Sequence, residues 1–258
     1  MHSKLPIRLQ LPVSLKWKES RYANISPYKD MFILSVHKDG LYVLKGRQFY
    51  KVPVSIDHQE LASCHSTYID KRGFIWITTD KGLYKSTAAT LVESALRPAT
   101  GLPFFFSFGK TDGIDNIEFN GRGTPTYAGL KNGQVFYPSM GGIVTFNPAD
   151  VPDKIINTAP AIEKILIDNK EADDSKDSIW LDPNFKYLTI DLVVPNFGEP
   201  KNLFLEYNLD NKEWKKIPAI DKQRITLVDI SSGDHRLVIR KRTGFGNTDY
   251  VYKNHCYL

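Results

Sequence analysis

Residues 32–42 read FILSVHKDGLY, and residues 74–84, 42 positions further along, read FIWITTDKGLY. A third copy follows Gly133, where residues 135–144 read VFYPSMGGIV. In each copy an apolar strand leads into a turn with glycine and then into a second strand, since glycine readily adopts the positive φ that tight hairpin turns need. Repeats of about 40–45 residues built from short strands are typical of propeller blades. The first half is therefore predicted to be a partial β-propeller of about three blades.

The pattern changes at residues 157–160 (NTAP), a linker-like stretch after which the glycine-turn repeat stops. Alternating strands are then expected at residues 162–167, 187–194, 203–209, 224–228 and 236–242. Strands at this spacing, with turn signals between them, indicate an immunoglobulin/fibronectin-like β-sandwich, here without a Cys–Trp–Cys framework. We therefore expect an all-β chain, with the partial propeller at 1–157 and the sandwich at 158–258.

The stretch between the second and third copies is less regular. Residues 88–96 (AATLVESAL) fit either a short helix or a strand, and Pro98 and Gly101 end that element. The aromatic run at 104–108 (FFFSF) is expected to be a buried strand in the core.

Composition limits the classes of function. The 258 residues are 41% hydrophobic and 12% aromatic, which fits two folded domains. The net charge of +5 is spread along the chain: residues 158–258 hold 15 basic and 16 acidic side chains, which leaves 19 and 13 elsewhere. There is no block of five or six consecutive basic residues, so nucleic-acid binding is not predicted. No apolar stretch reaches the length of a membrane span and the first residues do not resemble a signal peptide, so no membrane insertion is expected in this chain.

Side chains with catalytic or metal-binding chemistry form no recognisable motif. The histidines show no ligand spacing such as HxxxH, and His58, Cys64 and His65 together give only a weak indication of a metal site. His37, at a blade turn, is expected to face solvent. Cys64 and Cys256 lie far apart and are expected to be free thiols. With no phosphate-binding loop and no esterase elbow, we predict no enzyme, no cofactor and no metal.

Three tryptophans and one basic strand allow two interpretations each. Trp76, Trp180 and Trp214 could stack on a sugar ring, but packing in the core or between domains is favoured for Trp76 and Trp214. The strand at 236–242 could bind anions or lipid headgroups. Because alternation places its arginines on one face, protection of a sheet edge is the simpler interpretation.

Two stretches of the first half resemble a known family of repeats. Residues 70–83, DKRGFIWITTDKGL, are similar to the generic blade motif of two-component regulator propellers. Residues 111–120, TDGIDNIEFN, followed by 131–148, resemble the last blade of these propellers, although residues 137–139 read YPS where the family usually has Phe-Gly-Gly.

The second half resembles the three-Y (Y_Y_Y) domain that follows such propellers. The matching stretches are 207–214, YNLDNKEW, and 230–237, ISSGDHRL, whereas residues 196–200 replace an aromatic position common in the family. The resemblance covers about residues 30–253 and is to the periplasmic sensor region of hybrid two-component system histidine kinases. Only about three of the family's many blades are visible, and the kinase has no counterpart in this chain.

The resemblance implies a periplasmic, non-enzymatic fragment for sensing and signal transmission. Its expected ligand is an oligosaccharide, and its sandwich is expected to relay the signal to a membrane helix. Ligand contacts in propellers usually lie on loops, and the loop at 110–123 is the best candidate; the alternative for this loop is a structural role. Its candidate ligand-binding residues are Asp112, Asn116, Asn120 and Arg122.

Other partners follow from the expected shape. Strand edges left by missing blades predict self-association or a dimer within a membrane sensor. The alternative function is a stand-alone carbohydrate-binding or protein-interaction β module, and a propeller enzyme is a weaker alternative.

Overall fold

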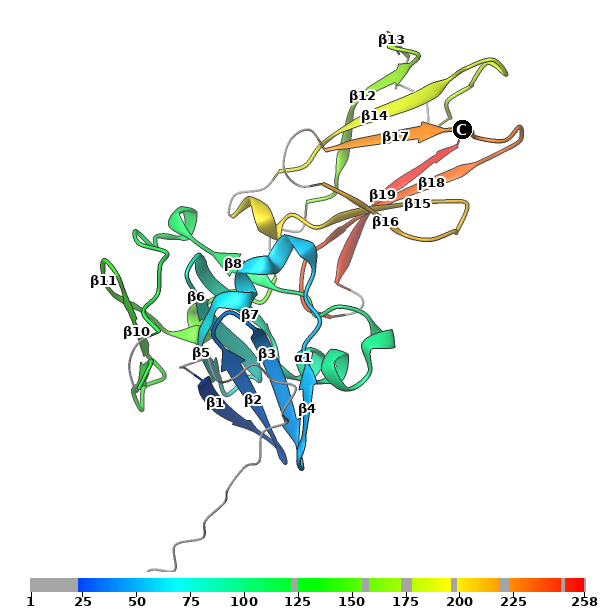
Figure 1. Cartoon of the computed structure of the whole chain (residues 1–258). Helices are drawn as coiled ribbons and strands as arrows, with labels where there is room; N and C mark the ends of the chain where they lie inside the picture. The colour runs from blue at the N-terminus through cyan, green and yellow to red at the C-terminus, as the bar shows by residue number, and fades with distance from the viewer. Residues whose placement is uncertain are drawn as a thin grey trace, which may run out of the picture. The chain divides into compact units, whose positions relative to one another are not determined.

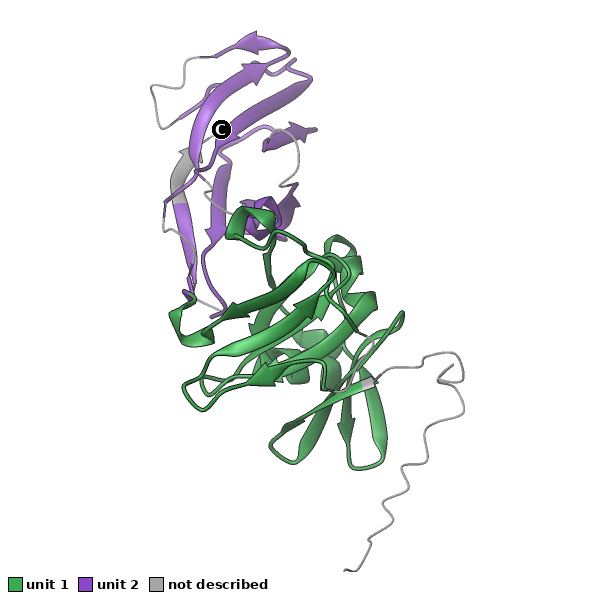
Figure 2. Ribbon diagram, turned by 90° about the vertical axis from the view of Figure 1, so that its left-hand side faces the viewer, with its two compact units in different colours: residues 1–151 green, residues 152–258 purple. Residues whose placement is uncertain are grey.

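A computed structural model of the chain describes residues 23–121, 125–154, 158–172, 178–195, 199–218, 223–246 and 249–257. It contains two compact units, Met1–Val151 and Pro152–Leu258 (Figure 2). The predicted boundary at 157 and 158 adjoins residues 155–157, which lie outside the described ranges. The sheets are antiparallel and helices are few and short, which confirms the all-β prediction. Within the described ranges no helix is both long enough and apolar enough to cross a membrane.

The first two copies of the repeat form two four-stranded meanders (Figure 1). The first contains β1 (Ala23–Tyr28), β2 (Met31–Val36), β3 (Gly40–Lys45) and β4 (Gln48–Lys51). The second contains β5 (Cys64–Ile69), β6 (Phe74–Thr79), β7 (Gly82–Thr87) and β8 (Phe106–Phe108). The predicted hairpins form, with Val36 paired to Gly40 and Thr79 paired to Gly82. The φ angles of +100° at Gly40 and +134° at Gly82 explain why both turns use glycine.

The third copy forms a smaller sheet with the order β11-β10-β9. Its strands are β9 (Ala128–Gly129), β10 (Val135–Ser139) and β11 (Gly142–Phe146). The predicted hairpin is present, because Ser139 pairs with Gly142. β11 lies at the edge of this sheet, and beside its turn Met140 and Ile143 are 65% and 70% exposed. The third sheet therefore ends in a strand whose outer edge pairs with no other strand of the described residues.

Residues 88–96 form the helix α1 (Ala88–Leu96), which settles the choice that the sequence leaves open. The buried positions recur at the spacing of one helix face; they are Ala88, Leu91, Val92 and Ala95. The Thr87 hydroxyl caps the helix by accepting the Thr90 N–H at 3.2 Å. The face packs into a core that contains Phe105, which confirms that the aromatic run is buried. Short 3-10 helices occur at η1 (Ile56–Ser63), η2 (Pro98–Thr100), η3 (Lys110–Asp112), η4 (Pro148–Asp150) and η5 (Pro200–Asn202).

The tryptophans lie in three different environments. Trp76 is fully buried in the first unit, as predicted. Trp214 is half-buried, with the Arg240 guanidinium carbon 3.6 Å from the centroid of its ring. Trp180 is 88% exposed. The rings of Trp76 and Trp214 thus pack against residues of their own units.

The second unit is a sandwich of two four-stranded sheets. One sheet has the order β13 (Lys170–Glu171), β12 (Ala161–Ile167), β14 (Tyr187–Val193) and β17 (Arg224–Val228). The other has the order β16 (Lys215–Ile217), β15 (Leu205–Leu209), β18 (Arg236–Arg242) and β19 (Tyr250–Tyr257). Both sheets contribute to one core, for example Ile190 from β14 and Leu205 from β15. The described residues thus contain the predicted sandwich.

The basic strand β18 is not an edge strand, so the prediction of edge protection is wrong. β18 pairs with β15 on one side and with β19 on the other. The sequence pattern did not indicate β19, because its aromatic and polar residues lack a clear apolar alternation. The charges of β18 are instead paired or enclosed: Arg240 binds Glu206 at 2.6 Å, and Lys241 is buried and donates to the Pro195 carbonyl at 3.2 Å.

Candidate functional site

The segment that follows η3 connects two sheets of the first unit. The Phe119 N–H donates to the carbonyl of Thr79, at the β6–β7 turn, at 3.1 Å. The neighbouring Asn120 N–H donates to the Pro138 carbonyl in β10 at 2.9 Å, and the Met140 N–H donates to the Glu118 carbonyl at 2.9 Å. Residues 118–120 are therefore held by the second sheet on one side and by the third on the other.

The predicted ligand-binding residues lie on and around this segment, with different local roles. Asp112 is exposed in η3, and its carboxylate accepts the Gly109 N–H at 2.9 Å. The Asn116 side-chain oxygen accepts the Glu118 N–H at 3.0 Å. Asn120 is exposed on the anchored part of the segment. Arg122 lies outside the described residues. Both alternatives for this loop, ligand binding and a structural role, remain predictions.

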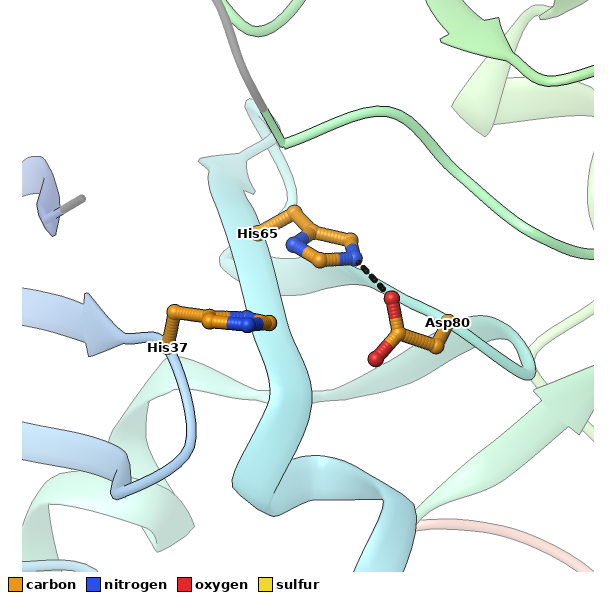
Figure 3. Close-up of side chains that lie close together, drawn as sticks. All are labelled: His37, His65 and Asp80. Carbon is orange, nitrogen blue, oxygen red and sulfur yellow. Dashed lines mark hydrogen bonds and ion pairs between the residues drawn. The ribbon is translucent and has the colours of Figure 1, made fainter. Parts of the chain in front are cut away.

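Next to this segment, two histidines and an aspartate come together from three separate elements (Figure 3). His37 follows β2, His65 is the second residue of β5, and Asp80 follows β6. The Nε2 atom of His65 lies 2.7 Å from a carboxylate oxygen of Asp80. The His37 ring stacks on the His65 ring, with centroids 5.3 Å apart and planes inclined by 20°. One nitrogen of each ring and one oxygen of Asp80 all lie within 4.8 Å of one another.

The backbone of Gly121 covers one edge of the His65 ring. A Cβ atom at position 121 would clash with Nδ1 and Cγ of His65, so the close approach requires glycine. With Nδ1 against Gly121, Nε2 is the ring nitrogen that faces Asp80. His65 is 8% exposed, whereas the Asp80 side chain is 42% exposed. The cluster is thus buried at His65 and open to solvent at Asp80.

Two predictions about these histidines are corrected by the structure. His37 does not simply face solvent, because it is half-buried against His65. The weak grouping of His58, Cys64 and His65 does not form either. His58 packs edge-on against aromatic rings, with its centroid 5.6 Å from that of Phe105, and the Cys64 thiol donates to the Leu61 carbonyl at 2.6 Å. Burial raises the pKa of that thiol well above its usual value.

The sequence did not reveal this cluster, because its members belong to no local motif. One signal was available: the 42-residue offset places His37 at the position of Thr79, so that Asp80 occupies the corresponding turn of the next copy. Equivalent turns of neighbouring repeats lie close when the repeats pack face to face. Chemically, two imidazoles and a carboxylate can hold a metal ion or exchange hydrogen bonds with a polar ligand.

Comparison with known proteins gives distant similarities. No family model matches the chain. The chain is 24% identical over 184 residues to "Histidine kinase P4" of Formosa agariphila, an alignment that covers 66% of this chain and 12% of that protein. The chain therefore corresponds to only a small part of this relative.

Similar solved structures are extracellular domains of two-component systems of B. thetaiotaomicron. The extracellular domain of the hybrid system BT3049 has a TM-score of 0.46 and 14% identity, over 93% of this chain and 38% of that one. An extracellular domain of the hybrid system BT4673 has a TM-score of 0.33 and 16% identity, over 93% of this chain and 30% of that one.

Proposed function

We propose that the chain is the extracytoplasmic sensing and signal-transmission part of a two-component sensor histidine kinase. The observation that carries this proposal is the order of modules: three glycine-turn hairpins, each in its own sheet, followed by a β-sandwich. That order, together with the motif residues around Asp70 and Gly142, resembles the sensors of this class. The 24% identical stretch in a histidine kinase supports the same assignment. A periplasmic location is part of the proposal.

In this proposal the first unit consists of propeller blades. The meanders β1–β4 and β5–β8 would be two blades, and β9–β11 a third with fewer strands. The sandwich of the second unit would be the three-Y domain, which passes the signal to a membrane helix. No catalytic step is assigned to the chain.

The ligand in this proposal is an oligosaccharide bound at the loop that contains Asp112, Asn116, Asn120 and Arg122. Amide and carboxylate groups suit this ligand because each can accept or exchange hydrogen bonds with sugar hydroxyls. Asn120 is the most informative of the four. It is exposed, and its backbone is fixed by the bond to Pro138, so the side chain is presented from a rigid position.

Calorimetric titration with a panel of oligosaccharides tests the ligand. We expect at least one of them to bind and to raise the midpoint of thermal unfolding, because a ligand that binds only the folded state stabilises it. Asn120→Ala should weaken that binding, whereas Asn184→Ala, an exposed asparagine of the second unit, should leave it unchanged. Binding of no oligosaccharide, or equal losses in both variants, would contradict the proposed ligand.

The coding sequence downstream of Leu258 tests signal transmission separately. A continuation into an apolar helix and a kinase domain is expected. A stop codon directly after Leu258 would contradict a role in relaying a signal across the membrane, whatever the chain binds.

A second candidate function, a protein-interaction module, is favoured by the edge of β11. This strand leaves one edge unpaired among the described residues, and Ile143 on it is 70% exposed. Exposed apolar edges pair readily with another chain, so self-association through β11 is expected. Light scattering after size exclusion should give a dimer that Ile143→Lys converts to a monomer. Ile56→Lys, at a 77% exposed site in η1, is the matched control, and an unchanged dimer in Ile143→Lys would exclude β11 as the interface.

A further inference from the structure

We propose that His37, His65 and Asp80 form a binding site for a divalent transition-metal ion, and that Zn²⁺ fits its donors best. The sequence alone predicted no metal site, since the three residues are separated by long stretches of chain. The fold brings their side chains together in the first unit (Figure 3). This site does not depend on the proposed oligosaccharide.

The donor set selects the metal. Imidazole nitrogen is a preferred ligand of zinc, copper and nickel, whereas magnesium and calcium take oxygen ligands. Two imidazoles and one carboxylate are a common set for zinc sites that keep a fourth position open to water or another ligand. The exposed side of Asp80 provides that opening, and it also gives the ion a path to the buried His65.

The observed geometry requires only small shifts of the three side chains. Donor atoms of a tetrahedral zinc site lie about 3.4 Å apart, given zinc–ligand distances of about 2.0–2.2 Å. His65 and Asp80 are already within 2.7 Å, so an ion between them would replace their hydrogen bond and push them slightly apart. The His37 nitrogen, within 4.8 Å of the other donor atoms, would move inward by a rotation of its side chain.

The surroundings of His65 hold the ring in the orientation that a metal needs. Gly121 lies against the Nδ1 edge, which leaves Nε2 to face Asp80. The His65 carbonyl also accepts the Ser35 hydroxyl at 3.4 Å, which ties the start of β5 to β2. A ring held in this way loses little conformational freedom when it binds an ion, and this favours affinity.

Metal binding would link two sheets of the first unit. His37 belongs to the β2–β3 turn of the first sheet, whereas His65 and Asp80 belong to the second. An ion held by all three would cross-link the two sheets and stabilise the folded state in proportion to its occupancy. Metal binding can therefore be measured as an increase in the stability of the folded state as well as by titration.

Calorimetric titration of the chelator-treated full chain with zinc chloride tests the site. We expect one Zn²⁺ per chain and a higher midpoint of thermal unfolding, with no effect of Mg²⁺ at the same concentration. His37→Gln and Asp80→Asn, which alter the less buried members, should each lower the affinity about tenfold or more, by analogy with the loss seen when even indirect metal contacts are removed.

The matched control is His235→Gln in the second unit. His235 also contacts a carboxylate, that of Asp210 at 2.8 Å, but it has no second histidine beside it among the described residues. Its variant should bind Zn²⁺ like the unaltered chain. X-ray absorption of the zinc-loaded chain should show two imidazoles in the coordination sphere. Absence of stoichiometric zinc binding, or variants of His37 and Asp80 that bind as tightly as the His235 control, would overturn the proposal.

Discussion

The indole N–H of Trp76 donates to the carboxylate of Asp70 at 3.0 Å, and both side chains are buried. The same carboxylate accepts the backbone N–H of Arg72 at 2.9 Å and that of Phe74 at 3.0 Å. The Asp70 side chain therefore closes the β5–β6 turn and anchors it to the Trp76 ring of β6. This explains why an aspartate, a turn and a tryptophan occur together in the second copy of the repeat.

Loss of this carboxylate should destabilise the first unit. Asp70→Ala leaves three N–H groups without their acceptor, of which the Trp76 indole N–H is buried. We expect the free energy of unfolding to fall by about 1–3 kcal/mol, the usual effect of an unsatisfied buried donor. Urea denaturation followed by tryptophan fluorescence measures the change. The exposed Asp115 gives the control, since Asp115→Ala should have almost no effect. Equal stability of the two variants would show that the Asp70 contacts are not important for the fold.

The Cys64 thiol should be unreactive in the folded protein. It is buried, it donates to the Leu61 carbonyl, and burial raises its pKa far above neutral pH, so the reactive thiolate is scarce. Iodoacetamide at neutral pH is expected to leave Cys64 unmodified in buffer and to modify it completely in guanidinium chloride, as measured by mass spectrometry of the peptides. Rapid labelling of Cys64 in buffer would indicate that the start of β5 opens readily.

The hairpins could be predicted from the sequence because their signals are local. Gly40, Gly82 and Gly142 each follow the end of an apolar strand by three or four residues, and each has the positive φ that the turn requires. The cluster at His65 could not be predicted in this way. It depends on which turns of neighbouring sheets meet, and packing between sheets, not any local motif, determines that. The edge prediction for β18 failed for a related reason, because its neighbour β19 was not recognised.

The pair His235 and Asp210 should make stability depend on pH. The hydrogen bond to Asp210, together with that to the Ser231 carbonyl, raises the pKa of His235, and the bond to His235 lowers the pKa of Asp210. The raised His235 pKa adds stability that is complete below its ordinary value of 6.5 and is lost as pH rises through the folded value. The lowered Asp210 pKa adds stability above 3.8 that is lost as pH falls through the folded value.

Measurement of unfolding midpoints between pH 4 and pH 9 tests this pair. The difference in stability between the unaltered chain and His235→Gln should be largest between about pH 4 and 6.5 and should shrink above that range, by less than about 1 kcal/mol in total for an ion pair near the surface. A difference that does not change with pH would mean that the proton on His235 plays no part in stability.

Arg240 should stabilise the second unit through its planar guanidinium as well as its charge. The guanidinium carbon lies 3.6 Å from the Trp214 ring centroid and 4.1 Å from that of Tyr250, and two of its nitrogens bind Glu206. Lysine keeps the charge but loses both the paired hydrogen bonds and the stacking, so Arg240→Lys should lower the free energy of unfolding by about 1–2 kcal/mol. Denaturant unfolding measures this loss.

A comparison with Arg224 separates the effect of the paired hydrogen bonds of Arg240 from the effect of its stacking. Arg224 also binds a carboxylate with two nitrogens, at 2.5 and 2.8 Å from Asp191, but no aromatic ring of the described residues stacks on it. Arg224→Lys should therefore cost less than Arg240→Lys, because it removes paired hydrogen bonds without removing stacking. If both variants lose the same stability, stacking of Arg240 on the rings of Trp214 and Tyr250 contributes nothing to the free energy of unfolding.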